Sequence, residues 1–455
     1  MPLEKDSLSL LTDALKQLDA GFTHLPDFDA IVPARERMAE VLGEVADRMR
    51  DNYPYFHPLY AGQMLKPPHP VARAAYSLAT WINPNNHALD GGRASTAMEI
   101  EAVAEIAAMF GWQTHLGHLT GGGTMANLEA LWVAGQLQPG KRIVASAQGH
   151  YTHERISAVL RLPFSKMPTD NTGHMDMNAL ETEAARGDLG CVVATLGTTG
   201  VGSVDPLPEI LKLRERYGFR VHVDAAYGGY FTLADNLGAP AHAAYDLICN
   251  ADSVVIDPHK HGLQPYGCGC VIFRDPGAGA LYRHDSPFTY FSSRNELHLG
   301  EISLECSRSG ASAVALWATQ KLLPLVRGGE FARELSASRS TAIQFAQRLR
   351  DDGRFMVPFD PDLDIVVWAP RAKTASAASA ESQRIFDEAA KDDLHLAMTT
   401  LPAAFFAQSA PELEADTAGI LCLRSVMMKP EHEAWLDEIF ARLVKASARL
   451  RTRHW

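Results

Sequence analysis

Short apolar runs and helical patterns alternate along the middle of the chain. Between about residues 98 and 275, five runs predict buried strands: RIVAS, CVVATLG, RVHVDAA, SVVID and GCVIFR. The stretches between them carry apolar residues at helical spacing. Because strands that alternate with helices form parallel sheets with helices on both faces, this region predicts an α/β domain with a mostly parallel sheet.

Both ends of the chain depart from this alternation. The first 55 or so residues show helical spacing, and the Pro- and aromatic-rich stretch NYPYFHPLYAGQMLKPPHP then breaks regular structure. From about residue 330, two long helical patterns flank DIVVW and ILCLRS, while the low-complexity stretch KTASAASAES predicts a loop. We therefore expect an arm that packs on something else (1–85), a large domain (86–328) and a small C-terminal α+β domain (329–455).

Composition restricts the class of protein further. A chain of 455 residues that is 46% hydrophobic is long enough for a large core and a smaller second domain. No apolar run approaches the roughly 20 residues of a membrane helix, and the charged start MPLEKDSLSL is unlike a signal peptide, so we expect a cytoplasmic protein. A net charge of −12 argues against nucleic acid and anionic membranes as partners. The six cysteines have no zinc or disulfide spacing, and we expect no metal.

A glycine-rich turn opens the helical run in LTGGGTMANLEALWVAG. Gly122, Gly123 and Thr124 stand where the helix would begin, so its free N–H groups and its positive end would point outward. Such a helix start is suited to bind a phosphate group. Taken alone the pattern is ambiguous, because similar turns also start many helices that bind no ligand.

A carboxylate and a lysine each follow a predicted strand. Asp224 comes directly after RVHV, at the carboxyl end of a strand, where open α/β sheets bind ligands. Lys260 follows the next strand, within IDPHKHG. Either residue alone would be interpreted as a turn cap or a solvated loop charge. The phosphate site, the carboxylate and the lysine nevertheless occur together in the order that pyridoxal 5′-phosphate (PLP) requires, so we predict PLP as the cofactor.

Each part of the predicted site meets a chemical need of PLP. The cofactor forms an imine with a lysine amine, for which Lys260 is the candidate. A carboxylate beside the pyridine nitrogen, here Asp224, keeps that nitrogen protonated. His150 follows the strand RIVAS and is placed to supply an aromatic plate over the ring. His259 is a candidate phosphate donor, although a histidine at a loop tip is equally often a surface group.

The motifs TGGGTMANLEAL, QGHYTH, TLGTTGVGSVDP, HVDAAYGG and SVVIDPHKHG together resemble the group II PLP-dependent amino acid decarboxylases. The resemblance covers roughly residues 55–430. It implies the aspartate aminotransferase-like fold (fold type I), with a mostly parallel seven-stranded sheet. The site residues that it implies are Lys260 for the imine, Asp224 for the ring nitrogen, His150 and Ala226 for the two ring faces, Thr199 near the ring, and Gly123, Thr124 and His259 for the phosphate.

Two segments refine the resemblance. Many family members carry Asn-Pro-His-Lys before the imine, whereas this chain has Asp257, which would contact the phosphate only through its backbone N–H. The stretch HKHGLQPYGCGCVIFRD, with PFTYF and CSRSGA, is closer to the archaeal tyrosine/aspartate decarboxylases and to sphingosine phosphate lyase. Within CSRSGA, Ser307 and Arg308 resemble the segment that reaches a neighbouring subunit's phosphate. This implies a homodimer with shared active sites and a swapped N-terminal arm.

The resemblance also suggests residues for the substrate side of the site. By position, Tyr290 in SPFTYFSSRNELHLG would protonate the substrate carbon from a mobile loop, with Tyr282 as the reserve. Arg424 resembles the family's arginine that faces the substrate, although a domain-interface ion pair is as good an interpretation. Asn86 and His87 are candidates to line the pocket near the N-terminal segment.

The predicted reaction is α-decarboxylation of an L-amino acid, which gives an amine and CO2. An alternative is a carbon–carbon lyase of the sphingosine phosphate lyase type, which would use the same Lys260, Asp224 and His150 but needs further cations for a substrate phosphate. A non-catalytic PLP-binding scaffold is the other alternative, and the intact lysine and carboxylate argue against it.

Overall fold

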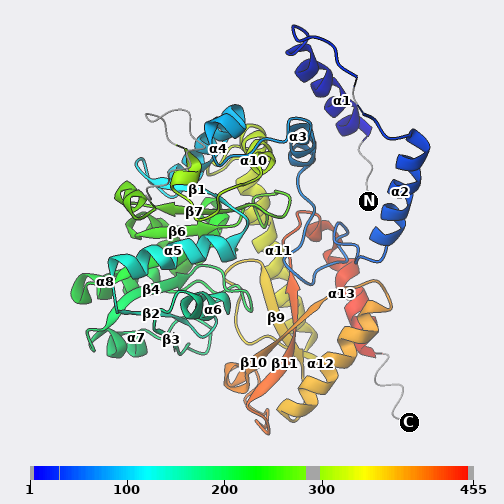
Figure 1. Cartoon of the computed structure of the whole chain (residues 1–455). Helices are drawn as coiled ribbons and strands as arrows, with labels where there is room; N and C mark the ends of the chain where they lie inside the picture. Colours follow the sequence, from blue (N-terminus) through cyan, green and yellow to red (C-terminus); the bar gives the residue numbers. More distant parts are fainter. Residues whose placement is uncertain (1–4, 30, 283–297, 449–455) are drawn as a thin grey trace.

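The computed structural model describes residues 5–29, 31–282 and 298–448. The chain forms a large α/β body and a smaller α+β body, and the first two helices of the chain extend away from them (Figure 1). Helix α11 (Glu330–Asp352) runs between the two bodies and packs on elements of each. Within the described residues, no helix combines the length and the apolar character that a membrane span requires.

The large body contains a seven-stranded sheet in the order β1-β7-β6-β5-β4-β2-β3. Its strands are β1 (Leu116–Thr120), β2 (Arg142–Ser146), β3 (Phe164–Met167), β4 (Leu189–Thr195), β5 (Arg220–Asp224), β6 (Ser253–Ile256) and β7 (Gly269–Phe273). Strands β3, β2, β4, β5 and β6 pair in parallel, whereas β7 lies antiparallel between β6 and β1. The predicted mostly parallel sheet is confirmed.

Helices cover both faces of this sheet. They are α4 (Leu89–Met109), α5 (Gly123–Leu137), α6 (Thr152–Val159), α7 (Met177–Ala184), α8 (Leu207–Tyr217), α9 (Ala239–Asp246) and α10 (Gly310–Leu322). Successive residues of a strand point to opposite faces. On β6, Val254 belongs to the core cluster that includes residues of α4 and α8, and Val255 belongs to the cluster around α5. Both side chains are fully buried, which explains why the strands are continuous apolar runs.

The smaller body is built on a four-stranded antiparallel sheet in the order β10-β11-β9-β8. Its strands are β8 (Phe355–Met356), β9 (Ile365–Pro370), β10 (Ala397–Pro402) and β11 (Gly419–Val426), with the helices α12 (Ala375–Ala390) and α13 (His432–Ala448). Trp368 is fully buried and meets Phe355 edge-on, with 5.0 Å between the ring centroids. The described chain also contains the short 3₁₀ helices η1 (Gly229–Leu233), η2 (Ile248–Asn250), η3 (Pro276–Leu281), η4 (Leu299–Glu301) and η5 (Ala403–Phe406).

The loop predicted for KTASAASAES is wrong, because most of this stretch opens helix α12. Thr374 caps the helix through its side-chain oxygen, which accepts a hydrogen bond from the N–H of Ala377 at 3.2 Å. The repeated alanines are the strongest helix formers. Ala375 and Ala378 are fully buried, so low complexity here reflects a small-residue packing face.

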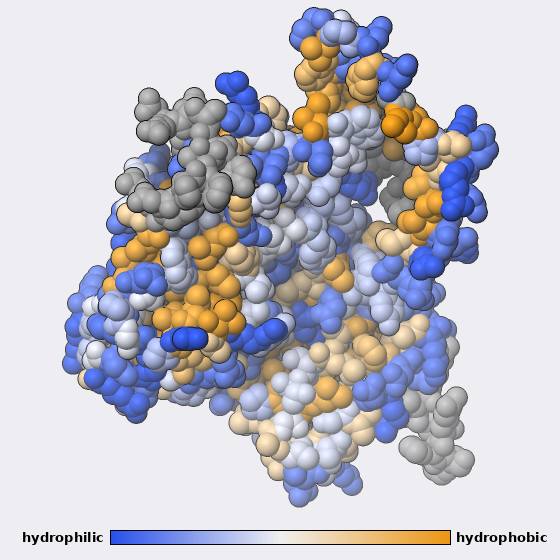
Figure 2. Space-filling model, viewed as in Figure 1, coloured by the Kyte–Doolittle hydropathy of each residue, from blue (hydrophilic) through white to orange (hydrophobic). Residues whose placement is uncertain are grey.

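The N-terminal arm leaves much apolar surface exposed. It contains α1 (Lys5–Ala20), α2 (Arg35–Met49) and α3 (Pro70–Thr80). No residue of α2 is buried, and its apolar side chains repeat at helical spacing: Met38, Val41, Leu42, Val45 and Met49. Figure 2 shows apolar residues along α1 and α2 and a second apolar area over α5. Helix α1 packs on α3, whereas the apolar stripe of α2 is not covered by any part of the chain that the structure describes.

Candidate active site

A cavity of about 620 Å³ opens where β4, β5 and β6 end and α5 begins. The carboxyl ends of parallel strands meet at one edge of a sheet, so residues far apart in sequence converge there. The predicted residues that line this cavity are Gly122, Gly123, Thr124, His150, Thr199, Asp224, Ala226, Asp257, His259 and Lys260.

Two glycines at the start of α5 are required, one for its backbone conformation and one for a close approach. Gly122 has φ +148°, a left-handed region that favours glycine. A Cβ on Gly123 would lie 2.6 Å from Asp257 Oδ2, so only glycine fits. The preceding Gly121 donates its N–H to Glu305 Oε2 at 2.9 Å. The N–H of Gly121, just before the helix, thus points at a carboxylate oxygen, as the N–H groups of a phosphate-binding turn would point at a phosphate.

Asp224, the last residue of β5, is buried and charged. Its Oδ1 accepts the N–H of Ala226 at 3.1 Å, and its Oδ2 lies 2.8 Å from His153 Nε2. Burial alone would raise the pKa of this carboxyl, but the contact with His153 and the Ala226 N–H lower it more, so the net pKa falls below the usual range. The group is therefore a carboxylate at neutral pH, the state that can hold a protonated pyridine nitrogen.

Lys260 lies next to Asp257, which corrects the role given to that carboxylate. Lys260 Nζ is 3.0 Å from Asp257 Oδ2, and the side chain of Asp257 is only 3% exposed. The backbone N–H of Asp257 donates to Ala226 O at 3.1 Å and is not available to a phosphate, so the predicted backbone contact is wrong. Asp257 is instead the charge partner of the lysine.

His150 is held in the cavity by the start of α6. Its Nδ1 accepts the N–H of Thr152 at 3.3 Å and lies 2.7 Å from Thr152 Oγ1. Burial lowers the pKa of His150, and the nearby Lys260 and His153 lower it as well, against the charge of Asp224. The ring is therefore neutral at pH 7, and because Nδ1 accepts a backbone N–H, its proton resides on Nε2.

His259 leaves one ring nitrogen without a partner. Its Nδ1 is buried and has no hydrogen-bond partner in the described part of the chain. The ring stacks at a tilt on Tyr266, with 4.7 Å between centroids, and burial lowers its pKa. A buried nitrogen without a partner beside the glycine turn fits a phosphate-binding role.

Two cavity-side residues were missed by the sequence analysis. His153 contacts Asp224, and the carboxylate of Glu305 accepts a hydrogen bond from the glycine turn. A signal for the first was present, because two histidines three residues apart, in QGHYTH, lie on one face of a helix start. No local signal marked Glu305, which reaches the turn from 184 residues away in sequence.

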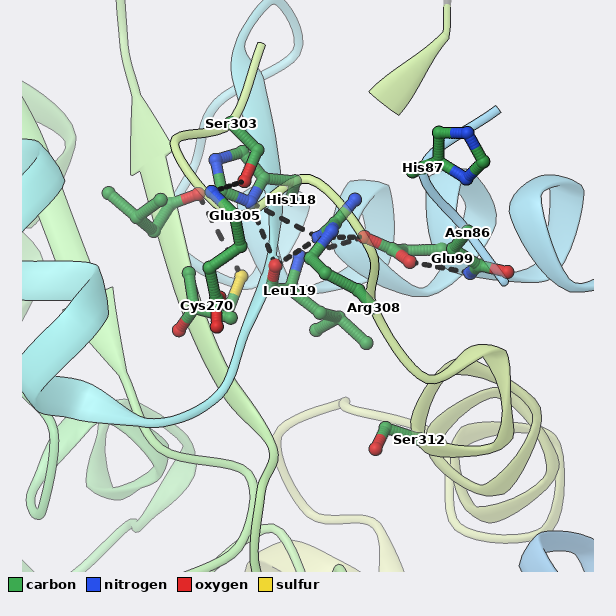
Figure 3. Close-up of polar contacts among 12 residues, drawn as sticks. Asn86, His87, Glu99, His118, Leu119, Cys270, Ser303, Glu305, Arg308 and Ser312 are labelled. Atoms are coloured by element: carbon green, nitrogen blue, oxygen red, sulfur yellow. Dashed lines mark hydrogen bonds and ion pairs between the residues drawn. The ribbon is translucent and has the colours of Figure 1, made fainter. Parts of the chain in front are cut away.

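Figure 3 shows that Asn86 belongs to a buried polar network beside the cavity. Its Nδ2 donates to Glu99 Oε2 at 2.6 Å, and its side chain is fully buried. Arg308 also turns inward: its Nη1 donates to Glu99 Oε1 at 2.9 Å and to Leu119 O. The prediction that Asn86 lines the substrate pocket is wrong, because its amide is committed to Glu99.

His87 and Ser307 lie outside the cavity lining of the single chain. His87 is half-buried, and Figure 3 shows its ring apart from the Arg308 network. Ser307 is exposed, and its hydroxyl accepts Asn85 Nδ2 at 3.1 Å. An exposed Ser307 is compatible with the predicted contact to a second subunit, and both roles stay predictions.

Tyr290 lies outside the described residues, but its reserve, Tyr282, is described. Tyr282 is buried and donates its hydroxyl to Glu129 Oε2 at 3.0 Å. Burial, followed by the charge of Glu129, raises its pKa. Its ring packs on Trp132, away from the cavity. Tyr282 therefore lies outside the cavity lining of the single chain, and its role as the reserve acid stays a prediction.

Arg424, on β11, joins the smaller sheet to two other segments. Its Nε donates to Gly200 O at 3.1 Å, and its Nη1 donates to Gly62 O and to Gln63 Oε1. These acceptors are neutral, so an ordinary ion pair does not describe the contact. Its Nη2 is buried without a hydrogen-bond partner in the described chain. Gly200 follows Thr199, a cavity residue, which leaves Arg424 close to the site but outside its lining.

The converging lysine, the charged Asp224 and the anion-binding turn, at the carboxyl edge of this sheet, define a PLP-dependent enzyme of fold type I. The model of the pyridoxal-dependent decarboxylase conserved domain matches residues 36–370. The chain belongs to this family, and it is a decarboxylase that uses PLP. In the described residues, no His, Cys, Asp and Glu side chains are grouped to hold a metal ion.

Relatives agree with this assignment. The chain is 27% identical to an L-tyrosine decarboxylase of Enterococcus faecium, over 81% of this chain and 78% of that protein. It is 27% identical to a probable L-tyrosine/L-aspartate decarboxylase of Methanopyrus kandleri, over 78% of this chain and 92% of that protein. Identity to an aspartate 1-decarboxylase of Aliivibrio fischeri is 31%, over 59% of this chain and 54% of that protein.

Solved structures share the fold. Mouse CSAD superposes with a TM-score of 0.77 at 20% identity and covers 96% of this chain and 92% of its own. Oryza sativa TDC, solved with PLP and tryptamine, has a TM-score of 0.78 at 18% identity and covers 99% of both chains.

Proposed function

We propose that this chain removes the α-carboxylate of an L-amino acid and releases CO2 and the corresponding amine. The observation that carries this proposal is the convergence of Lys260 and the charged, buried Asp224 in one cavity. The family and its amino acid decarboxylases support it. Because the relatives act on tyrosine or aspartate by name, the substrate class is an L-amino acid whose side chain is left open.

Different residues of the cavity would bind different parts of PLP. Lys260 would attach its aldehyde, Asp224 would pair with its ring nitrogen, and His150 and Ala226 would take the ring faces. Gly122, Gly123, Thr124 and His259 would bind its phosphate, and Thr199 would lie near the ring. When bound, PLP supplies an electron sink for the electron pair that the departing CO2 leaves behind.

The chain must also deliver a proton to the substrate carbon. We assign this step to Tyr290, by its position in the sequence. His150 is the second candidate, because its neutral ring carries a proton on Nε2 and it lines the cavity. Asp257 holds Lys260 Nζ in the cavity at 3.0 Å, which keeps the amine near the reacting atoms.

We propose that two copies form the working unit. The arm presents an apolar stripe on α2, and Ser307 is exposed beside the cavity, so a second copy can cover the first and supply the hydroxyl. Arg424 and His87 would then face the substrate from the rim of the completed pocket. The lyase alternative needs further cations for a substrate phosphate. Arg93 and His87 are the candidates that the sequence offers for this role, and neither lines the cavity of the single chain.

The experiment is a substrate screen, and its control is a variant without the lysine that would form the imine. Each proteinogenic amino acid is incubated with holoenzyme, and CO2 and amine are measured together. Lys260→Ala serves as the control variant, because its half-buried side chain leaves little core cavity on truncation. Equal amounts of CO2 and amine from one or a few amino acids support the proposal. Turnover by Lys260→Ala at the normal rate, or consumption of substrate without CO2, refutes it.

A further inference from the structure

His153 lies directly beneath the carboxylate of Asp224. It stands on the first turn of α6, its side chain is 1% exposed, and its Nε2 is 2.8 Å from Asp224 Oδ2. Both ring nitrogens are buried and lack a well-aligned hydrogen bond in the described part of the chain, so Nε2 meets Oδ2 at close range but off the hydrogen-bond axis. Because a carboxylate can only accept, this close contact is attractive only when Nε2 carries a proton.

A second histidine near Asp224, on the same strand, has different partners. His222 lies two residues earlier on β5, and its ring bonds Asn127 Oδ1 and Ser253 Oγ, each at 2.9 Å. Burial lowers the pKa of His222 to about 3, so it stays neutral. His153 is therefore the side chain that contacts Asp224 in the described structure, and the backbone N–H of Ala226 makes the second contact.

These two contacts leave part of the carboxylate open. An ionised carboxylate has roughly four lone-pair sites, and Ala226 and His153 occupy one on each oxygen. A contact on each oxygen fixes the plane of the carboxylate as well as its charge. The remaining lone pairs can then accept a proton-bearing ring nitrogen in one orientation.

We propose that His153 is a positioning residue for Asp224: through the close contact of its Nε2 with Oδ2 it orients the carboxylate toward the ring nitrogen of PLP. The inference rests on the role proposed for Asp224. Its consequence is specific, because removal of the His153 donor must weaken the contact with a ligand that has a ring nitrogen and leave other ligand contacts unchanged.

The test measures the affinity of the full-length apoprotein for two ligands. One is PLP, and the other is its deaza analogue, in which carbon replaces the ring nitrogen. His153→Phe should weaken PLP binding about tenfold, the loss expected for one hydrogen bond to a charged group, and leave the affinity for the analogue unchanged. His153→Gln, which keeps a donor, should retain PLP affinity within about threefold. His222→Gln is the matched control and should not change the ratio of the two affinities.

The outcomes separate the inference from the proposed function. An equal loss for both ligands in His153→Phe, or no loss for PLP, overturns the positioning role. If His153→Phe does not fold, His153→Asn gives the same ratio, because its shorter side chain cannot reach Oδ2. Asp224→Asn must itself lower the ratio of the affinity for PLP to the affinity for the analogue. If this ratio does not fall, the proposed role of Asp224 fails, independently of the result for His153.

Discussion

His174 joins the two bodies of the protein through a charge that depends on pH. It lies in the turn between β3 and α7, and its Nε2 is 2.7 Å from Oδ2 of Asp362, which precedes β9. The same Oδ2 accepts the N–H of Val204 at 2.9 Å. Burial alone would lower the pKa of His174, but Asp362, Asp170 and Asp205 raise it from 6.5 to about 9.

The pKa shift sets both the size and the direction of the effect. A rise from 6.5 to about 9 corresponds to at most about 3.5 kcal/mol, since each pKa unit is worth about 1.4 kcal/mol. The side chain is 26% exposed, so solvent screening reduces this to roughly 1–3 kcal/mol. The folded state binds the proton more tightly, so the stabilisation is complete below about pH 6.5 and is lost as the pH rises through about 9.

We expect His174→Gln to remove the stabilisation that depends on pH. The glutamine keeps a donor for Asp362 but never carries a charge. The free energy of unfolding, measured in urea, should be lower in the variant by roughly 1–3 kcal/mol near pH 6, and the difference should vanish near pH 10. His242→Gln is the control, because His242 forms an exposed pair with Asp246 that should contribute less than about 1 kcal/mol. A difference that is equal at both pH values would refute the reasoning.

Three further predictions concern the active site. Asp224→Asn should lower the rate by several powers of ten, and a drop below about tenfold, or 1.4 kcal/mol of barrier, would place the electron-sink role elsewhere. Tyr290→Phe should spare the loss of CO2 but slow amine formation. Part of the product should become a carbonyl compound, either with O2 consumed as the oxidant or with the amino group left on the cofactor as pyridoxamine phosphate. CO2, amine and O2 are measured together, and a normal amine yield would exclude Tyr290 as the acid. Glu305→Gln should tighten PLP binding severalfold, because it removes a negative charge from the turn that would bind the phosphate. The control Glu301→Gln, at an exposed position, should leave the affinity unchanged. Equal PLP affinities of Glu305→Gln and the unmodified chain in fluorescence titrations would contradict this.

The sequence predicts the buried parts of the fold best. The runs around Val192, Val223 and Val254 are recognised because strands buried on both faces need continuous apolar residues. Strand β1 was missed, since LGHLT contains Gly117 and His118, and the latter is buried only because Glu129 accepts its Nε2 at 3.0 Å. Such a polar pair depends on tertiary structure and leaves no local pattern.

The same distinction holds for the site. Lys260 and Asp224 are predictable because the chemistry of PLP demands those residue types after successive strands. Asn86 was misplaced because its partner, Glu99, lies a few turns along α4 and pulls the amide into the core. The spacing of His150 and His153 was visible in QGHYTH, but the contact of His153 with Asp224 was not, because it depends on the pairing of β2 with β4 and of β4 with β5.

The bare surface of α2 ties helix formation to protein concentration. A 15-residue helix with no buried residue is marginal in water, because most helical stability in proteins comes from packing an apolar face. A partner that packs on the apolar stripe of α2 would therefore also stabilise the helix itself, so the helix and this contact should form and melt together. If that partner is a second copy of the chain, dilution will unwind α2 while the two sheets stay folded. The helix content of the arm will then depend on the concentration of the enzyme.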